Sequence, residues 1–190
     1  QRMARLISAV ESVACLPAYR EEVLSRSDPI ARHPTRAKSV FMGYDFHVHG
    51  NEHGQGFGLI EVNTNAAFLI LGYEMYQMKG HPLPVADFTR DEIRHMIETE
   101  MSLQGKTASA PFKVAITDEA PSQQRLFVEF LAYNELFKSY GWDSRIVDYR
   151  DLFKEFSPDF IYNRYTDFFL TEPSSSVLRE KFLRGDVCLS

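Results

Sequence analysis

The pattern of apolar and polar positions divides the first half of the chain into helices and one pair of strands. Helical spacing of apolar residues predicts helices over 3–15, 18–24, 66–78 and 88–103. Two β-prone runs, 43–48 and 57–63, flank a short segment rich in Gly, Asn and His. Such a segment between two strand patterns predicts a β-hairpin.

The second half alternates strand and helix patterns. The predicted strands span 112–117, 144–148, 160–163 and 187–189. The predicted helices between them span 122–140, 149–156 and 173–183. This order indicates a parallel sheet with right-handed crossovers, and therefore an α/β fold. The segment 105–111 reads as a linker, so we expect a helical and hairpin region over 1–105 and a Rossmann-like domain over 111–190.

The second strand of the hairpin carries a polar face. Alternation places Glu61 and Asn63 on one face, with Leu59, and places Ile60 and Val62 on a face that can be buried. A carboxylate and an amide two residues apart on a rigid strand suit a hard cation or a phosphate. The alternative interpretation is an ordinary half-buried strand with a solvated polar face.

Two neighbouring features can extend this polar face. Asp45 would join Glu61 in an acidic pair that favours Mg²⁺ only in some pairing registers, and the sequence does not fix the register. After the strand, the small residues Ala66 and Ala67 allow a helix to start directly behind the polar corner 63–65. Free backbone N–H groups at that helix start would favour an anion.

Ligands of parallel sheets bind beyond the carboxyl ends of the strands. In this chain those ends carry 117–119, Asp148 and 163–167. Arg164 is placed to clamp a carboxylate with two hydrogen bonds, or alternatively to form a salt bridge with Asp167. No Gly-rich fingerprint follows the first strand, which argues against a dinucleotide site.

Three histidines in the hairpin, His47, His49 and His53, suggest a zinc site. No cysteine lies near them, and the only carboxylate at ligand spacing is Glu52. We therefore favour a solvated hairpin tip or an adventitious metal over a zinc centre.

Composition narrows the function classes. The chain has 190 residues, 44% hydrophobic and 25% charged, with a net charge of -5. It lacks the basic excess that nucleic-acid binding needs, and no apolar run is long enough to span a bilayer. The two cysteines, Cys15 and Cys188, lie near opposite ends and suggest reduced thiols in a cytoplasmic protein.

The motifs taken together resemble a known family. Gly-Tyr-Asp-Phe-His over 43–47, followed by Leu-Ile-Glu-Val-Asn-Thr-Asn-Ala over 59–66, is similar to the permuted ATP-grasp proteins. These include eukaryotic-type glutathione synthetase and a set of uncharacterised bacterial ATP-grasp proteins. Downstream, the stretches 118–125 and 162–168 follow in the order that the resemblance requires.

The resemblance implies an ATP-dependent carboxylate–amine ligase. ATP would phosphorylate a small carboxylate to an acyl phosphate, and an amine would then attack it, with Mg²⁺ neutralising charge on the phosphoryl group. By this likeness Glu61 and Asn63 hold Mg²⁺ and the ATP phosphates and act in catalysis. Asp45, through its possible pairing with Glu61 in the hairpin, is the third expected metal ligand. The residues that match substrate contacts are Thr64, Asn65, Gln124, Arg164, Tyr165 and Asp167.

Three departures from the family pattern qualify the expectation. Gly43 or Met42 stands where glutathione synthetase has an arginine, and Ala67-Phe68 replaces a common Gly-Gly. The family's glycine-rich loop, ATP-binding lysines and further metal carboxylates would lie beyond Ser190. We therefore expect the chain to be the N-terminal part of a longer protein, and inactive by itself.

Two other functions stay open at this stage. One is a non-catalytic module of ATP-grasp ancestry that binds a small acid or a protein. The other is a simple Rossmann-like regulatory domain, which would contact its ligand at Asp118, Asp148 and Arg164 and not at the hairpin.

Overall fold

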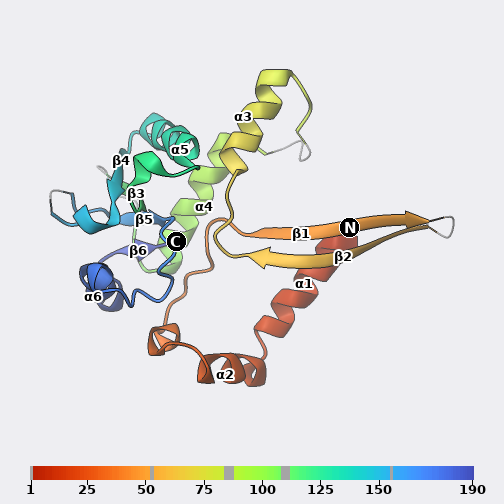
Figure 1. Cartoon of the computed structure of the whole chain (residues 1–190), viewed down its shortest axis with the longest axis horizontal. Coiled ribbons are helices and arrows are strands. Elements are labelled where there is room, and N and C mark those ends of the chain that lie inside the picture. The colour runs from red at the N-terminus through yellow and green to blue at the C-terminus, as the bar shows by residue number, and fades with distance from the viewer. Residues whose placement is uncertain (1, 52–53, 84–87, 108–111, 155) are drawn as a thin grey trace. The chain divides into compact units, whose positions relative to one another are not determined.

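The computed structural model describes residues 2–51, 54–83, 88–107, 112–154 and 156–190. The fold of these residues is α/β, as predicted, with an antiparallel hairpin and a four-stranded parallel sheet (Figure 1). No described helix combines the length and the apolar character that crossing a membrane would require. Both cysteines are free thiols; Cys15 is exposed and Cys188 is buried.

The chain divides into two compact units. The first contains Gln1–Pro34 and Met42–Thr64, and the second contains Thr35–Phe41 and Asn65–Ser190. The predicted linker 105–111 lies partly outside the described residues, and the division into domains at that point stays a prediction.

The first unit combines two helices with the hairpin. Its elements are α1 (Arg2–Ala14), α2 (Pro17–Ser25), a 3₁₀ turn (Pro29–Arg32), β1 (Gly43–Asn51) and β2 (Gly54–Asn63). The hydroxyl of Tyr44 donates a hydrogen bond to Glu11 on α1 (3.3 Å), and the Arg2 guanidinium lies 5.0 Å from the centre of the Phe57 ring. An isolated hairpin is marginally stable in water, so these contacts with α1 support it. No described side chain of this unit is fully buried.

The hairpin register differs from simple alternation because it contains a β-bulge. Asp45 pairs with Glu61, but the next pair joins Phe46 to Leu59, which leaves Ile60 as the extra residue. Paired residues share a face, so Leu59 lies on the same face as Phe46. Simple alternation predicted instead that Leu59 would share a face with Glu61. Ile60 is 65% exposed, so the predicted burial of its face is wrong at this residue.

The second unit is built around the parallel sheet. Its strands are β3 (Lys113–Asp118), β4 (Asp143–Asp148), β5 (Phe160–Asn163) and β6 (Cys188–Leu189). They lie in the order β4-β3-β5-β6, and every pair is parallel, as predicted. The strand order reverses between β3 and β5, where folds of this kind open a ligand crevice beyond the carboxyl ends of the strands.

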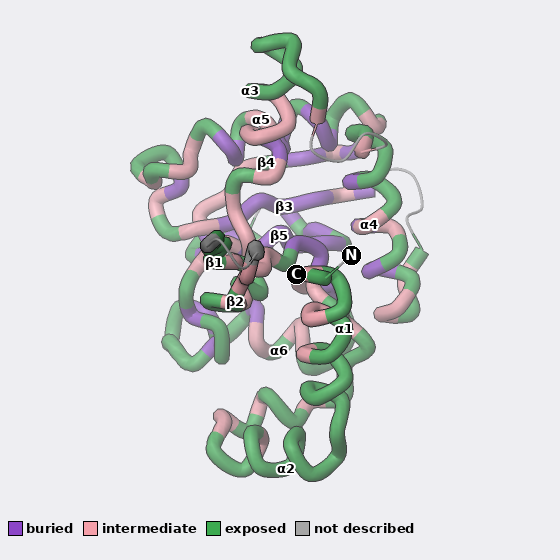
Figure 2. The backbone as a smooth tube through the Cα atoms, turned by 90° about the vertical axis from the view of Figure 1, so that its right-hand side faces the viewer, coloured by how far each residue is buried: buried purple, intermediate pink, exposed green. Residues whose placement is uncertain are grey.

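Helices supply the rest of the core of this unit. They are α3 (Leu69–Lys79), α4 (Arg90–Leu103), α5 (Phe127–Ser139) and α6 (Ser176–Arg184). Figure 2 shows the buried residues gathered along β3 and β5 and on helix segments nearby. An aromatic stripe of α5 is buried at Phe130, Tyr133 and Phe137, and each such side chain contributes about 1.5–3 kcal/mol by its burial.

Three predicted helices begin late or are short. Phe68 has φ 70°, so α3 begins at Leu69 rather than at 66. The helix predicted from 122 instead begins with a 3₁₀ turn, Pro121–Gln123. The extended backbone of Gln124 then delays α5 to Phe127. The helix predicted over 149–156 is a 3₁₀ turn, Tyr149–Asp151, because Phe153 has φ 68°. A left-handed residue cannot continue a right-handed helix.

Candidate functional site

The predicted metal ligands of the hairpin lie together. The register that the sequence left open pairs Asp45 with Glu61, so both carboxylates project from the same face. The Nδ2 group of Asn63 donates to Glu61 Oε1 at 3.1 Å and to Asp45 Oδ2 at 3.4 Å. All three side chains are exposed. Two carboxylates therefore converge on one electropositive group at a solvent-accessible position.

Two of the three hairpin histidines, His47 and His49, lie on β1. The rings of His47 and His49 stack with centroids 5.9 Å apart, and His49 lies against Gly56, where any side chain would collide with the imidazole. His53 and Glu52 lie outside the described residues. Among the residues that are described, no three His, Cys, Asp or Glu side chains are grouped to hold a metal. Thr64 is exposed at the end of β2.

In the second unit, Arg164 and Asn65 bind each other. Arg164 NH1 donates to the backbone oxygen of Asn65 (2.8 Å), to its Oδ1 (2.5 Å) and to the Ala66 oxygen (3.4 Å). In return, Asn65 Nδ2 donates to the Asn163 oxygen at 2.8 Å. The guanidinium therefore fixes the segment before α3 to the carboxyl end of β5. Asp167, the alternative partner considered from the sequence, instead binds the segment that follows it.

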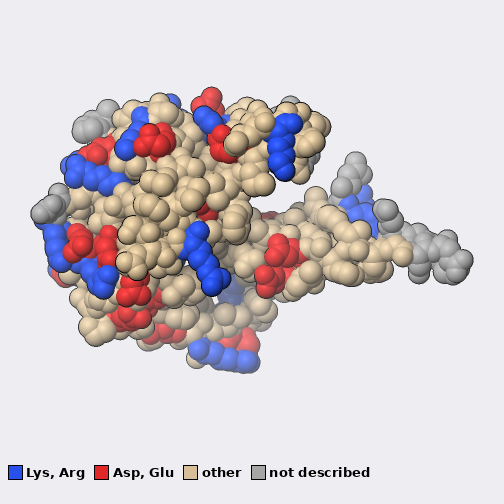
Figure 3. Space-filling view, turned by 45° about the horizontal axis from the view of Figure 1, so that its top comes forward, with Lys and Arg blue, Asp and Glu red and all other residues tan. Residues whose placement is uncertain are grey.

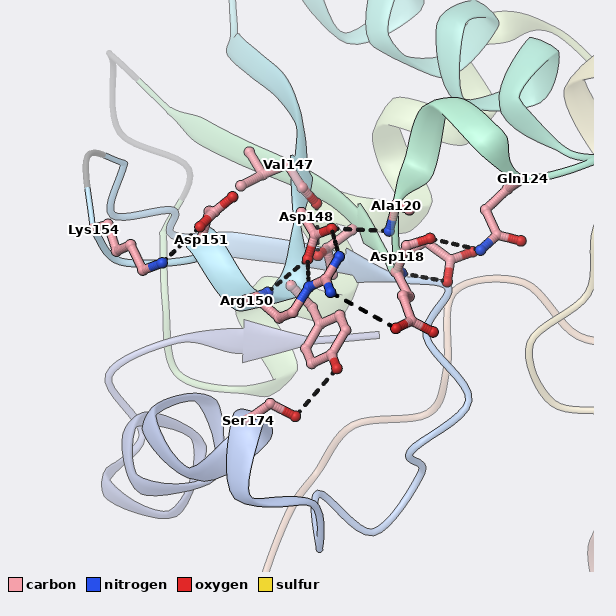
Figure 4. A network of polar contacts seen from close by, with 12 residues as sticks. Asp118, Ala120, Gln124, Val147, Asp148, Arg150, Asp151, Lys154 and Ser174 are labelled. Atoms are coloured by element: carbon pink, nitrogen blue, oxygen red, sulfur yellow. Dashed lines mark hydrogen bonds and ion pairs between the residues drawn. The ribbon is translucent and has the colours of Figure 1, made fainter.

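The carboxyl ends of β3 and β4 are joined by a second arginine (Figure 4). Arg150 donates to both carboxylate oxygens of Asp148, from Nε at 2.8 Å and from NH2 at 2.6 Å. Asp148 also accepts from the backbone N–H of Ala120 (2.9 Å) and of Arg150 (3.0 Å). Arg150 NH1 lies 3.9 Å from Glu119. This network closes the loop after β3 over the end of β4.

Gln124 and Tyr165, the other side chains predicted to contact the substrate, form hydrogen bonds with residues at the same edge of the sheet. Gln124 Nε2 donates to the Glu119 oxygen at 2.6 Å. The Tyr165 hydroxyl donates to Glu172 at 2.6 Å, and its ring stacks on Tyr149 with centroids 3.9 Å apart. These side chains therefore order the loops around the switch point between β3 and β5.

Asp167 organises the loop after β5. Its carboxylate accepts from the backbone N–H of Thr171 (2.9 Å) and of Glu172 (3.0 Å). Burial alone would raise the pKa of Asp167, but these N–H groups and the hydroxyls of Ser175 and Thr171 outweigh it and lower the pKa. The predicted substrate role of Asp167 is not tested by these contacts, which give it a structural one.

Two aspartates at the strand ends differ in their electrostatics. Burial raises the pKa of Asp118, although the N–H of Glu119 and the charge of Arg164 oppose the shift. The hydrogen bonds from Arg150 hold the pKa of Asp148 well below its usual range. Asp148 is therefore ionised under all ordinary conditions, whereas Asp118 is the carboxyl at this edge that protonates more readily.

We predict that Asp148→Asn lowers the free energy of unfolding by about 1–3 kcal/mol at neutral pH, because two backbone N–H groups and a guanidinium lose a charged acceptor. The lowered pKa makes this contribution complete above the unfolded-state pKa of about 3.9, and it fades as the pH falls below that value. Urea unfolding at pH 7 and in acid measures the difference between variant and wild type. A difference that stays constant into acid would contradict the account.

Two charged residues near the candidate site, Arg150 and Glu129, were not predicted from the sequence. Glu129 is fully buried on α5, and this burial raises the pKa of its carboxyl group, although the backbone N–H of Phe68 and the charge of Arg164 oppose the shift. The start of α3, predicted to favour an anion, therefore faces a carboxyl group of the protein itself. The sequence signal that could have identified Glu129 is the presence of an acidic residue, next to Phe130 and close to Tyr133, in a helix face that is otherwise apolar.

An apolar pocket of about 290 Å³ lies along α3. It is lined by Phe68, Leu69, Gly72, Tyr73, Tyr76, Leu83 and Phe88. The pocket differs from the strand ends because its lining is apolar and aromatic rather than charged.

On the surface shown in Figure 3, basic and acidic side chains are interspersed over the larger part of the visible face.

The geometry defines a class of fold, an α/β domain with a parallel four-stranded sheet and a separate polar hairpin. No family model matches the chain, and comparisons with curated proteins and with solved structures gave no significant match. The ATP-grasp relationship therefore rests on the sequence motifs alone.

Proposed function

We propose that the chain is the N-terminal portion of an ATP-dependent carboxylate–amine ligase of the ATP-grasp type. The observation that carries the proposal is the pairing of Asp45 with Glu61, with Asn63 bonded to both carboxylates. This arrangement follows from a bulged register that the sequence motif did not specify. It supplies oxygen donors on a strand scaffold, as the resemblance to the family requires.

The donor set suits Mg²⁺ together with a nucleotide. Mg²⁺ keeps several waters and is commonly bound by one or two carboxylates plus substrate phosphates, rather than by a complete protein cage. Asp45 and Glu61 would provide the two carboxylates, and the Asn63 amide would turn its oxygen toward the cation or its nitrogen toward a phosphate. When bound, Mg²⁺ neutralises charge on the transferred phosphoryl group.

The carboxyl ends of β3 and β5 are the proposed position of the carboxylate substrate. Gln124, Arg164 and Tyr165 lie at this edge, and each is held by a hydrogen bond to the same unit. Because their own rotamers are fixed, these groups would bind a substrate with little further loss of conformational entropy. Asn65, bonded to Arg164, belongs to the same set.

The test is an assay of ADP release by the full-length gene product, with ATP, Mg²⁺ and a panel of carboxylic acids paired with amino acids, peptides or polyamines. The proposal predicts ADP release that needs both an acid and an amine. If the full-length protein does not bind ATP in the presence of Mg²⁺, the catalytic proposal is excluded.

One observation favours a non-catalytic alternative. Both arginines at the sheet edge already have partners in the chain, Arg150 with Asp148 and Arg164 with Asn65. An acid substrate would have to share or displace these partners. A protein that only binds a small acid or a partner protein would retain its binding when Glu61 and Asn63 are both replaced, whereas a ligase would lose its activity.

A further inference from the structure

The apolar pocket along α3, which we name the α3 pocket, lies wholly within the second unit. None of its seven described lining residues is charged, and four of them are aromatic: Phe68, Tyr73, Tyr76 and Phe88. Its volume is about 290 Å³. Small-molecule sites are concave and are lined mainly by hydrophobic and aromatic side chains, so this lining is of the kind that binds a ligand.

Gly72 lies in the interior of α3 and lines the α3 pocket. Its backbone is helical, so no left-handed conformation requires a glycine at this position. A Cβ atom there would meet no described atom within 4 Å, apart from the backbone of the helix itself. Glycine in a helix interior is less stable than alanine because it loses more backbone entropy on folding. The fold of the described residues therefore does not need this glycine, whereas a ligand that approaches the helix backbone would need it.

A second local cost falls on the same pocket, at Phe68. This residue has φ 70°, although a bulky side chain disfavours the left-handed region. Its side chain is 62% exposed, so packing within the chain does little to offset the strain. The conformation is nevertheless fixed, because the Gly72 N–H donates to the Phe68 oxygen at 2.7 Å. Strained residues of this kind cluster at functional sites, where the strain holds a group ready for its ligand.

The charges beside the α3 pocket favour a neutral ligand. The Arg90 guanidinium lies 5.8 Å from the centre of the Tyr73 ring and is paired with Glu74. A cationic ligand would be repelled by Arg90, which already lies over that ring. An anionic ligand would lose its hydration without gaining an ion pair, because no described lining residue is charged and Arg90 already has a partner.

The rings and the volume of the α3 pocket favour an aromatic ligand. Tyr73 and Phe88 meet edge to face, with ring centroids 5.9 Å apart. Aromatic pairs prefer such edge-to-face or offset contacts, so a further ring would extend the same packing. An apolar cavity of about 150 Å³ is large enough to bind benzene. The α3 pocket is nearly twice as large, so it has room for two fused rings.

We propose that the α3 pocket is a binding site for a small neutral aromatic molecule of one or two fused rings. Gly72 leaves the space beside the helix backbone, and the four aromatic side chains provide the packing surfaces. The hydroxyl groups of Tyr73 and Tyr76 can donate to or accept from a polar atom of the ligand. This inference is independent of the proposed ligase function, whose residues lie on the hairpin and at the strand ends.

Titration of the chain with indole, a neutral two-ring probe, tests the proposal by NMR. We expect saturable shifts of the Gly72 amide and of the Tyr73 and Phe88 ring signals. Tryptamine and indole-3-acetate carry the same rings with a positive or a negative charge, and both should bind about fivefold more weakly. No saturable shift with indole, or equal binding of a charged analogue, would overturn the proposal. So would shifts of the same signals that depend on protein concentration without indole, because they would assign the pocket to self-association.

Gly72→Leu tests whether the space at Gly72 serves the ligand. The leucine side chain should fill the α3 pocket and weaken indole binding about tenfold or more, because the ring loses the surface on which it is buried. Gln77→Leu adds the same side chain to an exposed position of α3 outside the pocket. It is the matched control and should leave indole affinity unchanged. Equal indole affinity in Gly72→Leu and wild type would refute the assignment.

Gly72→Ala tests whether the fold itself needs the glycine. Urea unfolding should show a folding equilibrium constant about two- to fivefold higher than that of wild type, because alanine is the better helix former. A lower constant would show that the fold requires glycine and would contradict the proposal. The alanine variant should also bind indole about threefold more weakly. This measurement decides the outcome if the leucine variant does not fold.

Discussion

Replacement of Glu61 by Gln together with Asp45 by Asn is expected to weaken Mg²⁺-dependent ATP binding by the full-length protein about 100-fold or more. The two carboxylates face each other across the hairpin, so the double variant removes both charged ligands that the hairpin offers the proposed cation. A bound metal ion contributes several kcal/mol to stabilising phosphoryl charge, and 1.36 kcal/mol corresponds to a factor of ten. Titration calorimetry with ATP in the presence and absence of Mg²⁺ measures the effect.

The control for this experiment is Glu22→Gln, which changes an exposed carboxylate on α2 that pairs with Arg26. It should leave both nucleotide affinity and its Mg²⁺ dependence at the wild-type level. Because the hairpin ligands are exposed, the double variant should fold like wild type. Unchanged Mg²⁺-dependent affinity in the double variant would show that the hairpin does not hold the metal.

Arg164→Ala is expected to lower the free energy of unfolding by about 1–3 kcal/mol, the range found when a charged hydrogen-bond partner is removed. The substitution takes three hydrogen-bond contacts from Asn65 and Ala66. It also removes a charge that favours the ionised form of buried Glu129. Chemical denaturation followed by tryptophan fluorescence measures the loss, because Trp142 lies in the core of the same unit.

Two comparison variants give this prediction its specificity. Arg94→Ala removes a surface arginine that pairs with Glu98 one turn away, and it should cost less than about 1 kcal/mol. Combining Arg164→Ala with Glu129→Gln should cost less than the sum of the single changes, because the glutamine needs no compensating charge. Additive effects would mean that Arg164 and Glu129 do not interact.

The pH dependence of stability provides a further check. Burial raises the pKa of Glu129, with Phe68 N–H and Arg164 opposing the shift. The native state therefore holds the proton to a higher pH than the unfolded chain, and stability falls as the pH rises from about 4.3 through the folded-state pKa. The pKa values of Tyr133 and Tyr162 are raised by burial, so both stay protonated in this window. Glu129→Gln should flatten this part of the profile.

Periodicity predicted most of the fold because apolar burial determines it. The strand patterns of the second half predicted a parallel sheet. Helical spacing predicted a helix over 88–103, and the apolar residues Ile93, Ile97 and Met101 of α4 are buried. The helix starts were less predictable. Phe68 and Phe153 adopt left-handed conformations that their residue type does not favour, so nothing local marked these positions as helix breaks.

The candidate site was harder to predict because its details depend on tertiary contacts. The alternating pattern of a strand gives no sign of a β-bulge. The bulge at Ile60 shifts the register by one residue and thereby pairs Asp45 with Glu61. Arg164 binds Asn65, which lies 99 residues earlier in the chain, rather than the nearby Asp167. Glu129 lies in a helix whose pattern otherwise reads as core, and the groups that balance its charge come from other elements.

Paramagnetic broadening by Mn²⁺ tests the central claim most directly, because Mn²⁺ replaces Mg²⁺ at oxygen sites and broadens nearby NMR signals. In the presence of ATP, we predict selective broadening of Asp45, Glu61 and Asn63 in the full-length protein. The Glu61→Gln, Asp45→Asn variant should lose this broadening. Broadening that is absent from the hairpin, or that persists unchanged in the variant, would contradict the assignment of the hairpin as the metal- and phosphate-binding element.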